Sequence, residues 1–292
     1  MNKRAIRLIF LSGRSHPKLA SEIARQLGTP LGRITLGSFS NGEIRCHIKE
    51  ELNGRGVIVI QTHHPNPNDQ IFEQAVIIRA AKEAGAKSIT ALCPYFGYSR
   101  EPQRAKLAAD LLLKAGADRI LAIDLHEPVD GVNNTSSEPI FTQYIRNLPQ
   151  KDLVIVSPDT GRVKLALSLS KTLRCGYAEI RKIRQHNSIK MNLIKGEVNH
   201  KTCAIVDDII DSGATICAAA DLLNKNGAEQ TYAIATHGIF SGDVLKRIEA
   251  SEIKSIVVTN SIPIVNKTSK VEVRSLTSLL TEVVNHRASE LL

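Results

Sequence analysis

The chain has 292 residues, of which 42% are hydrophobic and 23% are charged, which is typical of a globular protein with room for two domains. Its formal net charge of +9 predicts anionic partners: nucleic acid, a membrane surface or polyphosphate substrates. Nucleic acid is disfavoured because aromatic residues make up only 4% of the chain, tryptophan is absent and no lysine- or arginine-rich run occurs.

The five cysteines are scattered singly, without a CxxC pair. An odd number of isolated cysteines disfavours a disulfide framework and a zinc site, and it fits a reducing compartment. No apolar run is long enough to span a membrane, and the apolar piece at 8–11 is too short for a secretory signal. We therefore expect a cytoplasmic protein with neither a membrane nor a nucleic-acid partner.

Short apolar runs alternate with helical patterns along the first half of the chain. The apolar runs predict strands at 6–11, 34–39, 44–48, 57–61, 88–93 and 119–124. The helical patterns lie at 17–27, 70–84 and 106–115. Because nearly continuous apolar strands alternate with helices, we expect a mostly parallel sheet covered by helices on both faces.

The same rhythm starts again in the second half. Strands are predicted at 153–156, 177–180, 204–206, 231–236, 255–259 and 271–275, and helices at 162–173, 216–224 and 276–286. Polar segments at 133–137 and 149–152 separate the two series. The predicted fold class is α/β, with two domains of similar size, 1–148 and 149–292, each a mostly parallel sheet flanked by helices.

The stretch 203–215, CAIVDDIIDSGAT, carries the strongest chemical signal. An apolar strand that runs into a small-residue turn and a helix start presents backbone N–H groups and a positive dipole end, which suits a phosphate. The carboxylates of Asp207, Asp208 and Asp211 suggest sugar hydroxyls and a divalent cation nearby. The alternative is an ordinary turn with an Asp or Ser helix cap.

Several motifs carry a family resemblance in order along the chain. They are FSNGE (39–43), NDQIFE (68–73), PYFGYSR (94–100), DLH (124–126), VSPDTG (156–161), KGEV (195–198), VDDIIDSGAT (206–215), THGIFSG (236–242) and TNSIP (259–263). VDDIIDSGAT resembles the phosphoribosyl-pyrophosphate motif of type I phosphoribosyltransferases, and the whole chain resembles the ribose-phosphate pyrophosphokinase family. This resemblance implies that ATP and ribose 5-phosphate are substrates, that the β,γ-pyrophosphoryl group is transferred to the 1-hydroxyl, and that Mg²⁺ is required. Such a transfer depends on positioning and on neutralisation of charge more than on covalent chemistry.

The resemblance implies a ribose 5-phosphate site in the second domain. Asp207 and Asp208 would face the ribose hydroxyls, directly or through a metal. The 5-phosphate would be held by backbone amides and hydroxyls of five consecutive residues, Asp211, Ser212, Gly213, Ala214 and Thr215.

The basic segment 181–184 matches the start of the family's mobile catalytic loop. Lys182 and Arg184 best match the Lys-x-Arg pair that cradles the transferred phosphates, with one residue fewer after them than usual, and Arg181 is a rival for the lysine's place. Cations on a loop that closes over polyphosphate act more strongly as water leaves. The alternative is a solvated basic edge.

The resemblance places two magnesium ligands on the ATP side, His126 and Asp159, each at the end of a predicted strand. A histidine is an unusual ligand for a hard cation such as magnesium. From the residues alone, His126 reads as a capping or packing side chain, and Asp159 reads equally well as part of an Asp-Thr-Gly turn.

The turn 39–43 corresponds to the family's adenine-binding turn, which approaches the nucleotide from a neighbouring subunit. Phe39 would stack on the base, and Asn41 and Glu43 would bind its edge. Arg100 keeps the family position of a phosphate or adenine contact. We therefore expect a homo-oligomer, at least a dimer. The alternative for 39–43 is a plain hairpin turn.

Two departures from the family pattern leave other functions open. The segment after Arg100 is about ten residues shorter than in the family, and Glu101 and Pro102 stand where a Gln-Asp pair is usual. A carboxylate there would repel ATP phosphates. The stretch 127–132 also lacks a Gly-Phe-Phe piece. The shortened segment favours a non-catalytic regulatory paralogue as the alternative. A phosphoribosyltransferase that uses only 206–215 is disfavoured, because the first domain carries motifs of its own.

Overall fold

The structure is a computed structural model that describes residues 8–148, 152–185, 188–265 and 268–291. Within these ranges, the side chains of 182–192 and 287–291 are not described. Over the described residues, no helix combines the length and the apolarity that crossing a membrane requires.

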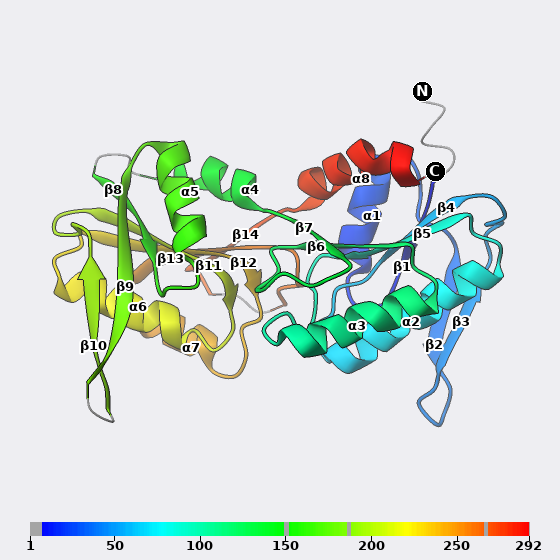
Figure 1. Ribbon diagram of the computed structural model, residues 1–292, viewed down its shortest axis with the longest axis horizontal. Coiled ribbons are helices and arrows are strands. Elements are labelled where there is room, and N and C mark those ends of the chain that lie inside the picture. Colours follow the sequence, from blue (N-terminus) through cyan, green and yellow to red (C-terminus); the bar gives the residue numbers. More distant parts are fainter. Residues whose placement is uncertain (1–7, 149–151, 186–187, 266–267, 292) are drawn as a thin grey trace. The chain divides into compact units, whose positions relative to one another are not determined.

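The chain folds into two compact units (Figure 1). Unit 1 comprises Met1–Thr135, Ser261–Pro263 and Ser275–Leu292, and unit 2 comprises Ser136–Asn260 and Ile264–Arg274. These units differ from the two predicted domains in where they assign 136–148 and the C-terminal helix. The boundary between 148 and 149 stays a prediction.

A five-stranded parallel sheet forms the centre of unit 1. Its strands, in spatial order, are β1 (Leu8–Ser12), β4 (Gly56–Ile60), β5 (Ser88–Cys93), β6 (Arg119–Ile123) and β7 (Val132–Thr135). The first four match apolar runs in the sequence. The polar segment 133–137 was a predicted boundary region, and the division between the units falls within it, between Thr135 and Ser136. The sequence did not predict that 132–135 form an edge strand, β7, which pairs with β6.

Helices cover both faces of this sheet. They are α1 (Pro17–Gln26), α2 (Pro67–Glu83), α3 (Pro102–Ala115) and α8 (Thr277–Leu291). The first three begin with a proline, which costs no hydrogen bond at a helix start. Helices α2 and α3 bury Ile78 and Ala109 against one face, while α1 and α8 contact each other and α8 reaches β5 (Figure 1). This packing is the reason that the C-terminal helix belongs to unit 1.

A two-stranded antiparallel hairpin, β2 (Ile34–Ser38) and β3 (Ile44–Ile48), forms a separate small sheet in unit 1. Its strand β3 contacts α2, and Ile34, Leu36, Cys46 and Ile48 pack against the same apolar cluster as α2. The hairpin therefore projects its turn, residues 39–43, while its base is fixed to the core.

Unit 2 is built on a seven-stranded sheet. Its strands, in spatial order, are β10 (Ser188–Lys195), β9 (Gly176–Gln185), β8 (Leu153–Ser157), β11 (Thr202–Ile210), β12 (Gln230–Gly238), β13 (Ile253–Thr259) and β14 (Val271–Arg274). All neighbouring pairs are parallel except β9 and β10. The α/β class with mostly parallel sheets flanked by helices is therefore confirmed for both units.

Two helices cover each face of the unit 2 sheet. On one face, α4 (Glu138–Ile145) and α5 (Val163–Leu173) pack on strand residues such as Ile155. On the other, α6 (Ala214–Lys225) and α7 (Val244–Ala250) pack on residues such as Ile205. Helix α4 lies before residue 148 and still packs on this sheet, which explains why the segment from 136 belongs to unit 2.

The strand order of unit 2 reverses beside β8. From β8 the chain passes through α5 to β9 on one side, whereas from β11 it passes through α6 to β12 on the other. Helices α5 and α6 therefore leave two adjacent strands, β8 and β11, toward opposite faces. In open α/β sheets, ligands bind in the crevice outside the carboxyl ends of strands at such a reversal.

Candidate active site

The segment joining β11 to α6 has the geometry of an anion cradle. The Asp211 carbonyl oxygen accepts the Ser241 N–H at 3.1 Å. The Ser212 carbonyl oxygen accepts a hydrogen bond from Arg247 Nη1 at 2.6 Å. The first bond of the helix runs from Cys217 N to Gly213 O at 3.0 Å, so earlier N–H groups take no part in intrahelical bonding. Backbone N–H groups at a helix start can bind a phosphate, and here the neighbouring carbonyl oxygens are already hydrogen-bonded to other residues.

Gly213 is required at its position for two reasons. Its φ of +71° is a left-handed conformation that side-chain-bearing residues rarely adopt. A Cβ atom added there would also lie 2.7 Å from Val244 Cγ2 on α7. The cradle is therefore shaped jointly by the DSGAT motif and by the helix packed beneath it.

Asp207 and Asp208 lie inside β11. The sequence predicted a strand over 204–206 with the aspartates after its end, and this was wrong, because pairing with β12 continues as far as Ile210. Asp208 is buried, and its N–H donates to Asp207 Oδ1 at 2.8 Å. The acidic pair is thus held by the strand rather than by a loop.

Arg162 faces both members of this pair. Its Nε lies 3.5 Å from Asp207 Oδ1 and 3.4 Å from Asp208 Oδ1. Arg162 immediately precedes α5, which follows β8, the strand beside β11. The arginine and the two aspartates therefore meet at the reversal in strand order.

The pKa of Asp207 is raised well above its ordinary value. Burial is the largest cause, followed by the hydrogen bond and the negative charge of Asp208, while the charge of Arg162 acts in the opposite direction. A buried acidic pair beside one cation therefore resists carrying two full negative charges.

Asp159 lies in a tight turn after β8. Its Oδ1 accepts the Gly161 N–H at 2.9 Å, and its carbonyl accepts Ser157 Oγ–H at 2.6 Å. This is the Asp-Thr-Gly turn that the residues alone suggested. The turn also fixes the carboxylate at the carboxyl edge of the sheet, on the same turn that delivers Arg162.

In unit 1, a buried histidine holds the loop that follows β5. Gly97 N–H donates to His63 Nδ1 at 3.0 Å, and His63 Nε2 lies 2.8 Å from Gln74 Oε1. Because Nδ1 accepts, Nε2 must carry the proton and donate it to Gln74. Burial lowers the pKa of His63 to about 4, so the imidazole is neutral. The PYFGYSR loop is thus fastened to the end of β4 and to α2.

Arg100 is exposed in this loop, directly before α3. Nearby, Tyr98 has a left-handed φ of +64°, and its hydroxyl donates to Asn68 Oδ1. Glu101, expected to repel ATP phosphates, forms an ion pair with Arg104 one helical turn later. Since both side chains are more than half exposed, this pair only weakly offsets the repulsion.

His126 lies in the loop after β6 in unit 1. Two hydrogen bonds hold this loop: Asp124 N–H donates to Thr135 O at 3.0 Å, and Leu125 N–H donates to Asn134 Oδ1 at 2.9 Å. His126 itself is half-buried. Asp159, the other predicted metal ligand, belongs to unit 2. Within the described residues, no group of three or more His, Cys, Asp or Glu side chains converges as a metal site.

The turn 39–43 is a closed hairpin turn. Phe39 N–H donates to Glu43 O at 2.8 Å, and Glu43 N–H donates to Asn41 Oδ1 at 3.2 Å. Phe39 is 51% exposed, and the Arg45 guanidinium lies 5.9 Å from the centre of its ring. The segment therefore combines the geometry of a plain hairpin turn with an exposed aromatic ring. This geometry fits both a plain turn and an adenine-binding turn.

Lys182 and Arg184 lie in β9, where their backbones pair with Asn192 and Ile189 of β10. The expected loop start at 181–184 was therefore wrong as local structure. The side chains of Lys182 and Arg184 lie outside the described part of the structure. The rival, Arg181, forms an ion pair with Glu179 of the same strand.

Sequence reasoning did not single out three residues of these loops. Arg162 was counted as a helical residue, although its place directly after SPDTG put it at a strand end. His63 was counted in a polar loop. Arg14, on the loop after β1, donates its N–H to the buried Glu73 Oε1 at 2.7 Å. Their partners are neighbours in space that lie 11 to 59 positions away along the chain, so no short motif identifies them.

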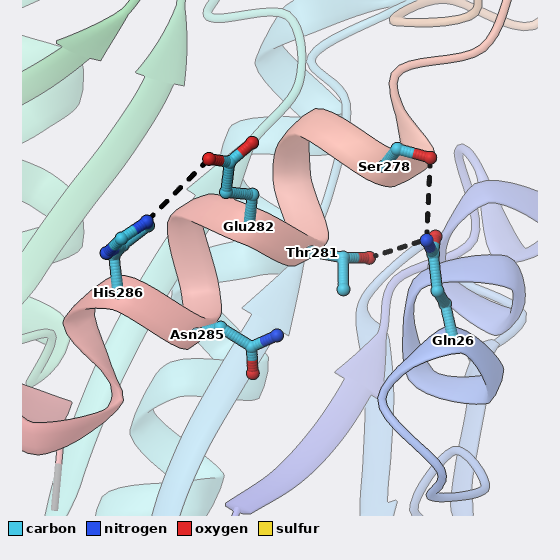
Figure 2. A pocket seen from close by; sticks show the side chains of 6 residues that line it. All are labelled: Gln26, Ser278, Thr281, Glu282, Asn285 and His286. Atoms are coloured by element: carbon cyan, nitrogen blue, oxygen red, sulfur yellow. Dashed lines mark hydrogen bonds and ion pairs between the residues drawn. The ribbon is translucent and has the colours of Figure 1, made fainter.

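A polar pocket of about 500 Å³ in unit 1 is lined by none of the predicted site residues (Figure 2). It lies where α1 meets α8 and is lined by Gln26, Ser278, Thr281, Glu282, Asn285 and His286. Several lining side chains bond one another: Gln26 Nε2 donates to Ser278 Oγ at 3.4 Å and accepts at Oε1 from Thr281 Oγ1 at 3.3 Å. These bonds are accounted for by helix packing and indicate no ligand.

Comparison with known proteins identifies the family. The N-terminal domain model of ribose phosphate pyrophosphokinase matches residues 8–116, and the phosphoribosyl synthetase-associated domain matches 177–289. The ribose-phosphate pyrophosphokinase of Burkholderia pseudomallei is 39% identical over 274 residues, covering 88% of this chain and 86% of that protein. The enzyme of the same name from Streptomyces coelicolor is 38% identical over 291 residues, covering 94% and 89%.

A solved structure agrees with these matches. The phosphoribosylpyrophosphate synthetase from Mycobacterium smegmatis is similar with a TM-score of 0.91 and 35% sequence identity, covering 97% of this chain and 99% of that chain. The resemblance inferred from the ordered motifs is confirmed by these findings. The chain belongs to the ribose-phosphate pyrophosphokinase family.

Proposed function

We propose that this protein is a ribose-phosphate pyrophosphokinase, which transfers the β,γ-pyrophosphoryl group of ATP to the 1-hydroxyl of ribose 5-phosphate and releases AMP. The observation that carries the proposal is the cradle after β11, with its acidic pair, at the strand-order reversal of unit 2. Family membership supplies the reaction, since relatives at 37–39% identity carry this name.

In this proposal the acceptor is held by unit 2. The amides and hydroxyls of 211–215 bind the 5-phosphate, and Asp207 and Asp208 orient the ribose hydroxyls, so that the 1-hydroxyl is presented to the nucleotide. Lys182 and Arg184 stabilise charge on the transferred phosphates. The acceptor side thus contributes positioning and cations rather than a covalent intermediate.

The nucleotide is held by Arg100 and by the turn 39–43 of a second copy of the chain. An exposed Phe39 beside Asn41 and Glu43 supports this role, because it offers a stacking face and hydrogen-bonding groups to a base. On this proposal the protein is at least a homodimer, acts in the cytoplasm and has no nucleic-acid or membrane partner.

Mg²⁺ is part of the proposal, with His126 of unit 1 and Asp159 of unit 2 each a proposed ligand. The Asp159 carboxylate fits a hard cation, and its orientation is fixed by Gly161 N–H. The His126 imidazole is a weaker match in donor chemistry. Bound magnesium would neutralise charge on the ATP phosphates during transfer.

The direct test is turnover. Purified protein with ribose 5-phosphate, Mg²⁺-ATP and inorganic phosphate is expected to form phosphoribosyl pyrophosphate and AMP in equal amounts. Ribose 5-phosphate binding without AMP formation would instead support the non-catalytic regulatory paralogue, which the short segment at Glu101 favours.

Two variants of neighbouring residues test the basic pair. Lys182→Ala is expected to lower kcat by orders of magnitude with little change in ribose 5-phosphate affinity, because its contacts belong to the transition state. Arg181→Ala is the matched control, since Arg181 is already paired with Glu179. A larger loss in Arg181→Ala would mean that the pair is misplaced by one residue.

A further inference from the structure

Arg162 is an unusual residue to find against an acidic pair in a substrate site. Its backbone carbonyl starts α5 by accepting the Ala166 N–H at 3.0 Å, yet its side chain makes no capping bond to that helix. The guanidinium points instead to Asp207 and Asp208. Its direction is therefore set by the acidic pair and not by the helix that it begins.

The three groups form a compact and largely dry cluster. Arg162 and Asp207 are each 13% exposed and Asp208 is 4% exposed, measured on their side chains. Charges that are shielded from water interact much more strongly than surface charges, and removing one partner leaves the others uncompensated. The three charges therefore stabilise one another in the ligand-free site.

Positive charge beside two neighbouring carboxylates reduces their mutual repulsion and favours the ionised form of both, in which each accepts hydrogen bonds from sugar hydroxyls. In this chain a guanidinium nitrogen within 3.5 Å of both carboxylates already supplies positive charge at that place. The guanidinium is also always protonated and cannot dissociate into solvent as an ion can.

We infer that Arg162 is a built-in counter-ion of Asp207 and Asp208, which allows the acceptor site to bind ribose 5-phosphate without a divalent cation. The inference rests on the proposed function for the identity of the acceptor. It restricts the metal requirement of the reaction to the ATP side. Arg162 is in this sense a positioning residue, because it acts on the sugar through the two aspartates.

The wild-type protein gives the first test. Calorimetric titration with ribose 5-phosphate, in EDTA and then in millimolar Mg²⁺, is expected to give dissociation constants that agree within about threefold. Binding that appears only with Mg²⁺ would overturn the inference and leave the proposed function standing. Absence of binding in both buffers would overturn the two together.

Variants of Arg162 give the second test. In EDTA, Arg162→Gln is expected to bind ribose 5-phosphate at least tenfold more weakly than wild type, and Mg²⁺ is expected to restore much of that loss. Arg162→Lys keeps the charge without the planar guanidinium, so its affinity for ribose 5-phosphate in EDTA should lie between those of wild type and Arg162→Gln. Equal or tighter binding by Arg162→Gln in EDTA would overturn the inference, since the arginine would then be blocking the site.

Lys164→Gln is the matched control. It removes one positive charge two residues further along the same helix, from an exposed position. Its affinity in EDTA should match that of wild type. A tenfold loss in this control as well would overturn the inference, because the effect would then follow from net charge alone. Rescue of Arg162→Gln by Mg²⁺ separates a lost counter-ion from a misfolded site, which the metal would not repair.

Discussion

Two loops of this protein leave the carboxyl end of a parallel strand and enter a helix, and they are held in different ways. The loop after β11, 211–213, is fixed by the Ser241 backbone N–H, by the Arg247 guanidinium and by the left-handed Gly213. The loop after β5, 94–101, is fixed by the buried imidazole of His63 and includes a left-handed residue that is not glycine, Tyr98.

The difference follows from topology. In unit 2 the strand order reverses beside β11, so a crevice for a ligand is a property of the sheet itself. In unit 1 the strands from β4 to β7 follow one another in order, without such a reversal. The loop after β5 therefore gains its shape from side chains that lie elsewhere in the chain. Both loops therefore depend on contacts from distant parts of the chain, and the loop of unit 2 lies in addition at a reversal in strand order.

The largest expected effect is at Gly213. Gly213→Ala adds a strained left-handed residue, at about 1 kcal/mol, and a 2.7 Å contact with Val244, at a further 1–3 kcal/mol. Urea unfolding should show a loss of about 2–4 kcal/mol, and ribose 5-phosphate binding should weaken with it.

Gly28→Ala is the control for this prediction. Gly28 has a similar φ of +75° with nothing within 4 Å of the added carbon, so it should cost about 1 kcal/mol. Equal losses in the two variants would show that α7 does not shape the loop after β11.

His63 predicts acid sensitivity of unit 1. The folded-state pKa of about 4 lies below the ordinary 6.5, so the unfolded chain takes up a proton first as pH falls. Titration of His63 therefore leaves the free energy of unfolding unchanged above about pH 6.5 and lowers it as the pH falls toward 4, by about 3 kcal/mol in total. Urea unfolding of wild type and His63→Gln across this range should show a shallower pH dependence in the variant.

Two controls sharpen the comparison of the two loops. His47→Gln, at an exposed position on β3, should leave the wild-type pH dependence unchanged. In His63→Gln the KM for ATP should rise more than the KM for ribose 5-phosphate, since His63 holds the loop that carries Arg100. An equal rise in both KM values would mean that the loop after β5 does not serve the nucleotide.

The part of the fold that could be predicted from sequence is the part with local signals. Nearly continuous apolar runs gave the central strands, and proline at a helix start or glycine at a turn marked several element ends. Strand β7 was missed because VNNT is polar and pairs at an edge. The extension of β11 through Asp207 was missed because buried carboxylates are rare in strands, and here the strand pairing and Arg162 make them tolerable.

The candidate site likewise contains a part with a local sequence signal and a part without one. The cradle at 211–215 is contiguous, so its motif was sufficient to find it. Arg162 and His63 were not found, because each acts on residues more than 30 positions away, Asp207 and Gly97. A motif records neighbours in sequence, whereas the charge balance of a buried acidic pair depends on neighbours in space.

The smallest expected effect on stability is at Phe39. Because its ring is 51% exposed, with the Arg45 guanidinium 5.9 Å from its centre, Phe39→Ala should change the free energy of unfolding by about 0.5 kcal/mol or less. If the turn 39–43 stacks on adenine, the KM for ATP should rise about tenfold, which corresponds to a stacking contribution of about 1.4 kcal/mol. Phe72→Ala on α2, 56% exposed, is the matched control and should change neither quantity. An unchanged KM in Phe39→Ala would leave 39–43 as a plain hairpin turn and would confine nucleotide recognition to the loop that His63 holds.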